Sequence, residues 1–295
     1  LDNEQAPAGK SLFNFQTVYM TLILNWKWFV LSLIICLGLA SIYLRYTIPI
    51  YQTYAKLLIK EENTSRGRNS LQYSTNLGMV SNSTGIDNEM EILKSSSIAI
   101  QAVKDLKLYT TYMSAGKVTN RLMYKTQPIS VDIDPIHLDI LTHPISLTIT
   151  REGKKYHVEG TYYSTNPDAP GKAYAIDKSF TALPAAIGTQ AGILTFIPNS
   201  TTPMKDGEKV LVRISPPKAV AIGYAAGLSI AQSSKSTSIA VLTINDQSPE
   251  RAIDYLKQLA ICYNRQANED KNEVAVRTEE FINGRLEKIN TELGS

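Results

Sequence analysis

The sequence has little of what a disulfide, zinc or nucleic-acid-binding protein requires. Its 295 residues include only two cysteines, Cys36 and Cys262, which excludes a disulfide scaffold and a zinc site with four cysteine ligands. The 30 basic residues barely exceed the 27 acidic ones, and the isoelectric point is near 8.6. This surplus is too mild for a dedicated nucleic-acid-binding protein, so no nucleic-acid partner is expected.

Sequence motifs of nucleotide-dependent and hydrolytic enzymes are also missing. The sequence has no G-x-x-x-x-G-K-[ST] phosphate loop, no nucleophile elbow and no H-E-x-x-H zinc motif. We therefore predict no catalytic residue, no cofactor and no metal site in these residues.

One cluster of acidic and histidine residues is the exception, because all its members are possible metal ligands: Asp132, Asp134, His137, Asp139 and His143. Asp132 and Asp134 alternate with Val131 and Ile133, so we interpret them as the solvent-facing side of a half-buried strand. A membrane-anchored enzyme with its active site in this cluster is the alternative hypothesis.

A long apolar stretch lies near the N-terminus. Between Lys27 and Arg45 there are 17 residues without a charge, which as a helix rise about 26 Å and nearly match a ~30 Å hydrocarbon core. We predict a transmembrane helix at 25–46, in contact with membrane lipid, after an amphipathic juxtamembrane segment at 1–24. A buried core helix is the alternative. Aromatic residues at both ends are typical of membrane-interface anchors: Trp26, Trp28, Tyr43 and Tyr46.

The rest of the sequence combines helical and strand patterns, so the predicted fold class is α+β. Residues 47–246 are expected to form a mixed α/β domain, whose β-rich insertion spans about 121–215. Within the insertion, Glu152 and Gly153 separate two strand-like segments and predict a hairpin turn.

Two further local patterns lie outside the insertion. Asn88, with Glu91 three residues later, predicts a capping box at the start of a helix. The apolar, β-branched segment 238–244 is typical of a strand buried on both faces.

A long helix is predicted to begin within residues 247–295. Ser248 is a suitable cap and Pro249 suits the first helical position, and no proline follows. The helical pattern is interrupted at Ser295, so we expect this sequence to be part of a longer protein. An apolar stripe along the helix is expected to pack in a coiled-coil hairpin or an oligomer contact: Leu256, Leu259, Tyr263, Phe281, Leu286 and Ile289.

The order of several segments is familiar. They are the Trp-Lys-Trp start at 26–28, the strand after Pro49, the segment 88–108, the strand 235–244 before Ser248-Pro-Glu-Arg-Ala252, and Phe281 to Leu293 on the long helix. Together they resemble the polysaccharide co-polymerases, the Wzz/Wzc-type chain-length determinants of bacterial envelopes. The resemblance covers most of residues 20–295 and is weakest at 109–215.

The resemblance implies a protein of the bacterial inner membrane with two membrane spans, the second outside this sequence, and its main domain in the periplasm. It implies a homo-oligomeric ring that regulates the chain length and export of capsular polysaccharide or exopolysaccharide. The implied partners are a Wzy-type polymerase, an outer-membrane polysaccharide export protein and the nascent polysaccharide.

The Wzc branch of this family carries a cytoplasmic tyrosine autokinase, which would add ATP and Mg²⁺ as cofactors. None of the kinase motifs lies in these residues, and we favour this branch on similarity alone. A kinase-less Wzz-type regulator of O-antigen length is one alternative. A membrane-fusion or efflux adaptor is another, although the lipoyl-like half-motifs of adaptors are not found.

Overall fold

The computed structural model describes residues 19–20, 23–59, 83–116, 119–165, 171–234 and 237–293. The chain divides into two compact units, residues 1–49 and 50–295. The first unit contains α2 (Trp26–Tyr46), which has a mean hydropathy of 2.0 and no buried residue. Within the described residues, α2 is the one helix that is long and apolar enough to cross a membrane.

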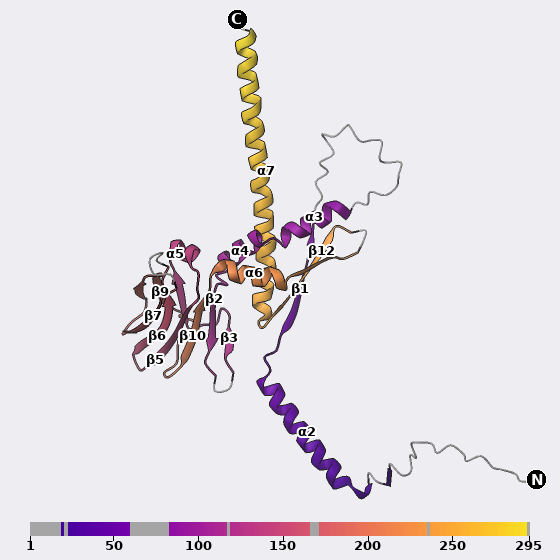
Figure 1. Ribbon diagram of the computed structural model, residues 1–295, viewed down its shortest axis with the longest axis vertical. Coiled ribbons are helices and arrows are strands. Elements are labelled where there is room, and N and C mark those ends of the chain that lie inside the picture. The colour runs from indigo at the N-terminus through magenta and orange to yellow at the C-terminus, as the bar shows by residue number, and fades with distance from the viewer. Residues whose placement is uncertain are drawn as a thin grey trace, which may run out of the picture. The chain divides into compact units, whose positions relative to one another are not determined.

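An antiparallel sheet of three strands has the order β1-β12-β11, and β1 and β12 lie beside the first part of α7 (Figure 1). Its strands are β1 (Tyr51–Leu58), β11 (Ser229–Gln232) and β12 (Ile239–Asp246). Along β12, Ala240, Leu242 and Ile244 are buried, while the residues between them are partly exposed. The prediction that this strand is buried on both faces is therefore wrong, because this chain covers only one face of it.

Four helices build the α/β part of this unit: α3 (Ser83–Leu93), α4 (Ser96–Asp105), α6 (Pro217–Gly227) and α7 (Pro249–Leu293). Helix α4 packs against α6 and α7, and α7 packs on β1 and β12. The predicted helix start at Asn88 is wrong, because α3 begins at Ser83. A second helix begins after Ser95, whose hydroxyl accepts a hydrogen bond from the Ile98 N–H at 3.4 Å.

Between α4 and α6 the chain forms two antiparallel sheets and a short helix (Figure 1). The six-stranded sheet has the order β3-β2-β10-β5-β6-β7, and the three-stranded sheet has the order β4-β9-β8. The elements are β2 (Thr110–Ser114), β3 (Arg121–Met123), β4 (Ile129–Ile133), α5 (Pro135–Ile140), β5 (Ile145–Glu152), β6 (Lys155–Tyr163), β7 (Ala173–Phe180), β8 (Ala185–Thr189), β9 (Gly192–Pro198) and β10 (Lys209–Ile214). The β-rich insertion thus begins with β2, earlier than the predicted residue 121.

Side chains join the two sheets of the insertion into one core. The Tyr112 hydroxyl of β2 accepts a hydrogen bond from the Val131 N–H of β4 at 2.8 Å. The rings of Phe180 and Phe196 lie 5.9 Å apart between their centroids. The predicted hairpin turn is confirmed, since Glu152 pairs with Lys155 and Gly153 adopts a φ of 59°.

Candidate functional site

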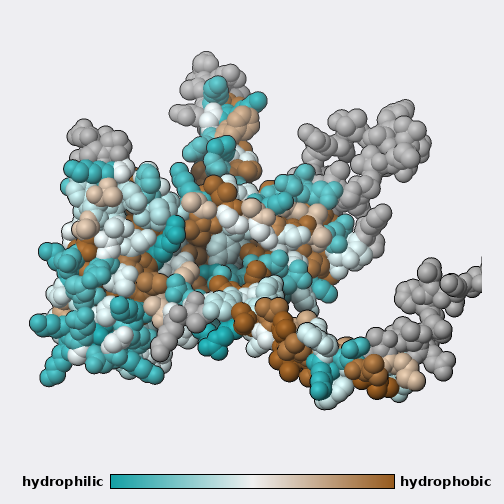
Figure 2. Space-filling view, turned by 60° about the horizontal axis from the view of Figure 1, so that its bottom comes forward, coloured by the Kyte–Doolittle hydropathy of each residue, from teal (hydrophilic) through white to brown (hydrophobic). Residues whose placement is uncertain are grey.

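Helix α2 presents its aromatic residues at its two ends. Trp26 and Trp28 lie in the first turn and Tyr43 and Tyr46 in the last, and the side chains of all four are exposed. The helix ends at Thr47, whose N–H and hydroxyl both donate to the Tyr43 carbonyl oxygen. Figure 2 shows α2 as a mostly hydrophobic segment, in contrast to the largely hydrophilic surface of the inserted sheets.

A buried ion pair stabilises the start of α7. The Asp246 carboxylate accepts from both the Nε and the Nη2 of Arg251, at 2.9 and 2.7 Å, and from the Ser248 N–H at 2.9 Å. The Ser248 hydroxyl accepts from the Arg251 N–H at 3.3 Å, which confirms the predicted cap. Burial opposes the charge on Arg251, but its hydrogen bonds to Asp246 raise its pKa.

The apolar stripe of α7 is divided into two parts with different surroundings. Leu256 and Leu259 are buried in the core of their own chain, and Tyr263 is partly buried and donates its hydroxyl proton to the Glu89 carboxylate of α3. These three residues were expected in a coiled-coil hairpin or an oligomer contact. They lie instead on the part of α7 that packs against α3, α4, β1 and β12 of the same chain.

The second part of α7 carries a surface that we call the distal apolar face: Val274, Phe281, Ile282, Leu286 and Ile289. Each of these side chains is at least 46% exposed. The guanidinium of Arg285 lies 5.3 Å from the centroid of the Phe281 ring. Only this part of the predicted stripe is free to contact another molecule.

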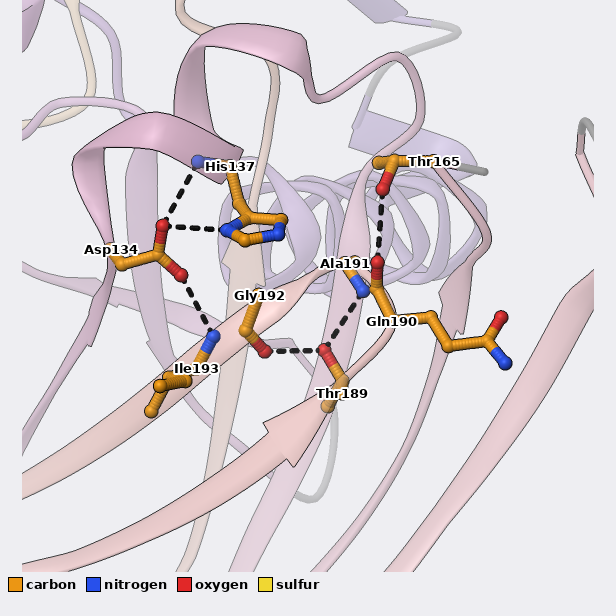
Figure 3. Close-up of polar contacts among 8 residues, drawn as sticks. All are labelled: Asp134, His137, Thr165, Thr189, Gln190, Ala191, Gly192 and Ile193. Carbon is orange, nitrogen blue, oxygen red and sulfur yellow. Dashed lines mark hydrogen bonds and ion pairs between the residues drawn. The ribbon is translucent and has the colours of Figure 1, made fainter. Parts of the chain in front are cut away.

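In the cluster of possible metal ligands, Asp132 lies on the partly exposed side of β4 as predicted, whereas Asp134 has a different role (Figure 3). Asp134 is the N-cap of α5, and its carboxylate accepts from the His137 N–H at 3.0 Å and from the Ile193 N–H at 2.9 Å. It also contacts the His137 Nδ1 at 2.7 Å. Asp134 is therefore not a solvent-facing strand residue, since Pro135 begins a helix here.

These contacts set the charge of Asp134. Burial raises its pKa, but the backbone N–H donors of His137 and Ile193 and the His137 ring outweigh burial and hold the pKa at about 2. Gly192 follows the turn between β8 and β9, where a Cβ would lie 2.7 Å from the Asp134 Oδ2. The turn is closed by the Thr189 hydroxyl, which donates to the Gly192 carbonyl oxygen at 2.7 Å (Figure 3).

The other members of the cluster have partners of their own. Asp132 pairs with Lys107 at 2.8 Å, Asp139 pairs with Lys104, and the His143 ring lies 5.0 Å from the Tyr163 ring. Across the residues that the structure describes, no three His, Cys, Asp or Glu side chains are arranged to hold one metal ion. Asp134 and His137 thus contact each other, while Asp132, Asp139 and His143 each contact a residue outside the cluster.

The sequence did not predict the Tyr263–Glu89 contact. It also did not predict that the apolar stripe of α7 is buried in its first part and exposed in its second. Glu89 and Tyr263 are 174 residues apart, so no local pattern connects them. The Asp246–Arg251 pair is local, and the carboxylate and guanidinium on either side of a predicted helix start were a signal for it.

Comparison with known proteins found a match to one family model. Residues 11–106 match the family model of Wzz, the chain length determinant protein, and no curated protein matches the chain. The matched segment is about a third of the sequence and includes α2, β1, α3 and α4. This match supports the polysaccharide co-polymerase family, and together with the apolar helix α2 it fits an inner-membrane protein with a chain-length-determinant role.

Proposed function

We propose that this chain is the membrane-anchored and periplasmic part of a polysaccharide co-polymerase. It assembles into a homo-oligomeric ring and regulates the chain length and export of a capsular polysaccharide or exopolysaccharide. It works with a Wzy-type polymerase and an outer-membrane polysaccharide export protein. The Wzz match over residues 11–106 is the observation that carries this proposal.

Helix α2 anchors the protein in the inner membrane. Its 21 residues rise about 32 Å, enough to cross the hydrocarbon core. Trp26 and Trp28 at one end and Tyr43 and Tyr46 at the other suit the two lipid–water interfaces. Residues 50–295 then lie in the periplasm.

The distal apolar face of α7 supports assembly. A helix with an exposed apolar stripe gains free energy by packing against another helix, and Phe281 and Leu286 are 63% and 53% exposed here. A neighbouring copy of α7 is the natural partner, because it offers the same stripe. The ring encloses a space whose dimensions, rather than a catalytic residue, regulate the polysaccharide.

The test is native mass spectrometry of the full protein in lipid nanodiscs. Replacing Phe281 and Leu286 together by Asp is expected to dissociate the oligomer, because the buried carboxylates would lack partners. Ile261→Asp is the matched control, since Ile261 lies on the same helix and is 55% exposed outside the distal apolar face.

The same variants are compared in cells that lack the native gene. The double variant should lose the normal distribution of polysaccharide chain lengths, whereas Ile261→Asp should keep it. A full ring in the double variant would contradict the assembly model. A normal chain-length distribution in cells without the protein would contradict the function.

We favour the Wzc-like branch, in which a cytoplasmic tyrosine autokinase uses ATP and Mg²⁺ in a further part of the protein. The kinase-less Wzz-type regulator is the alternative. The intact mass and phosphotyrosine content of the natively expressed protein distinguish them. A mass well above 32.6 kDa with several phosphates supports the kinase branch, and a larger chain without phosphate supports the alternative.

A further inference from the structure

A cavity with a mixed apolar and polar lining lies where the inserted sheets meet the helices of the second unit. It has a volume of about 490 Å³ and is lined by the end of α4, by β2, β3 and β4, and by the first turn of α7. This volume falls within the ~300–1,000 Å³ typical of small-molecule sites. None of the residues discussed above as assembly or membrane contacts lines it.

Two lysines line this cavity in an unfavourable backbone conformation. Lys107 has a φ of 52° and Lys125 a φ of 61°, and no other non-glycine residue of the described chain has a positive φ. Lys107 follows α4 where the Leu108 N–H returns to the Val103 carbonyl oxygen at 2.9 Å, a helix end that favours glycine. A side chain in this conformation costs about 1 kcal/mol, and such residues concentrate at ligand sites.

Each lysine forms an ion pair with a carboxylate. Lys107 Nζ lies 2.8 Å from Asp132, and Lys125 Nζ lies 2.6 Å from Asp254. The two lysine side chains are 58% and 65% exposed, so both retain donors for a further partner. The Tyr124 hydroxyl donates to the same Asp254 carboxylate at 2.8 Å.

The remaining charges of the cavity are balanced as well. Arg251 is paired with Asp246 at 2.7 Å, and Asp105 is paired with Arg265 at 2.9 Å. The charged residues that line the cavity and their ion-pair partners therefore amount to four cationic side chains and four carboxylates. Such a cavity does not select a strongly charged ligand, but it places ammonium donors next to carboxylate acceptors.

Two buried polar atoms at this cavity lack a hydrogen-bond partner. They are the Thr110 Oγ1 and the Gln127 Oε1, and both residues line the cavity. A buried acceptor without a donor costs about 1–3 kcal/mol. These two atoms are closed to water and could meet a ligand only if their side chains turned towards the cavity. A ligand rich in hydroxyl groups would reach the exposed groups directly, accepting from the lysines and donating to the Asp132 carboxylate.

We propose that this cavity binds an uncharged saccharide, one short segment of the polysaccharide that the protein regulates. The proposal rests on the proposed function for the source of the saccharide. The ammonium groups of Lys107 and Lys125 donate to sugar hydroxyls, and the carboxylate of Asp132 accepts from a neighbouring hydroxyl.

Because both lysines have a positive φ, they can be replaced by glycine without backbone strain. Lys107→Gly with Lys125→Gly removes both side chains, while glycine relieves the backbone strain. Each lost ion pair has an exposed lysine and a partly exposed carboxylate, and Asp254 keeps the hydrogen bond from Tyr124, so the loss is expected to be small. The double variant is therefore expected to melt no lower than the parent. Lys154→Gly is the control, because Lys154 is an exposed lysine in the turn between β5 and β6, away from the cavity.

Binding is measured by saturation-transfer NMR on the full chain in lipid nanodiscs, which avoids detergents with sugar head groups. The neutral probes are cellobiose, maltose and lactose, and the charged probes are glucuronic acid and glucosamine. At least one neutral disaccharide should bind, about tenfold or more weakly in the double variant and unchanged in Lys154→Gly.

Three results would overturn the proposal: no neutral disaccharide binds, only a charged probe binds, or binding is equal in the double variant. If the double variant melts below the parent, the single glycine variants and Tyr124→Phe are measured against the same criteria. Chain-length control in cells without any saccharide binding would reject the cavity ligand and leave the proposed function intact. Saccharide binding without chain-length control would reject the function instead.

Discussion

The ion pair between Asp246 and Arg251 is the most enclosed one in the described part of the chain. The two side chains are 3% and 17% exposed, and the carboxylate also accepts from the Ser248 N–H and the Tyr224 hydroxyl. One carboxylate thereby joins the end of β12, the start of α7 and helix α6. Burial is the main reason that the pKa of Tyr224 is raised, so this phenol stays a donor.

Arg251→Met is expected to destabilise the protein by about 3–5 kcal/mol, because the Asp246 carboxylate would remain buried without a counter-charge. Thermal or urea unfolding of the full chain measures this loss. Arg277→Met is the control, since its pair with Glu273 is exposed and worth about 0–1 kcal/mol. Equal stability of the two variants would contradict the role given to the buried pair.

Asp134 predicts a pH dependence of stability. Its pKa in the folded protein is about 2, below its ordinary value of 3.8, so it stabilises the fold above pH 3.8 and this contribution disappears as the pH falls towards 2. Asp134→Asn should lower the unfolding free energy by about 1 kcal/mol at neutral pH. Unfolding measured along a pH series should show the difference shrinking within that window. A difference that persists at pH 2 would contradict the assignment.

At the scale of elements, α7 is one continuous helix with two environments. Its first turns pack on α3, α4, β1 and β12, whereas its later turns carry the distal apolar face. The helix is 45 residues long, so it rises about 68 Å and extends beyond the core that covers its start. The first part stabilises the domain and the second is available for assembly.

Matched alanine variants separate these two roles. Leu259→Ala should cost about 2–5 kcal/mol of stability, because Leu259 is fully buried. Phe281→Ala should change the stability of the isolated subunit by no more than about 0.5 kcal/mol. Unfolding is followed at protein concentrations below those that support assembly. A large loss for Phe281→Ala under those conditions would mean that its ring packs within its own subunit.

At the scale of the whole molecule, the chain consists of an apolar helix and a separate folded unit. The Wzz match includes residues from both units. The insertion from β2 to β10 lies outside the match and supplies most of the residues that line the cavity.

Charges in the middle of α2 should prevent stable membrane insertion. Arginine near the centre of a span costs about 2.5–3.5 kcal/mol, so in the 295-residue chain, expressed without the second span that the resemblance implies, Ile35→Arg with Leu37→Arg should cause release from the membrane fraction at alkaline pH. Ile35→Leu with Leu37→Ile keeps the hydropathy and should remain in that fraction. Retention of the arginine variant would show that α2 is not the anchor.

The sequence alone was sufficient for features that depend on neighbouring residues. The apolar run predicted α2, Glu152-Gly153 predicted the hairpin turn, and Ser248 with Pro249 predicted the start of α7. Hydropathy, turn geometry and helix capping are all determined within a few residues of chain.

Only the tertiary structure decided which of the predicted surfaces are free. Leu256 and Phe281 belong to the same sequence pattern, but only Leu256 is buried, on the part of α7 that packs against α3, α4, β1 and β12, whereas Phe281 is 63% exposed. The cavity likewise combines Lys107, Lys125 and Arg251, which local patterns do not relate. A periodic stripe shows that a helix face must be covered, whereas the identity of the cover depends on contacts between distant segments.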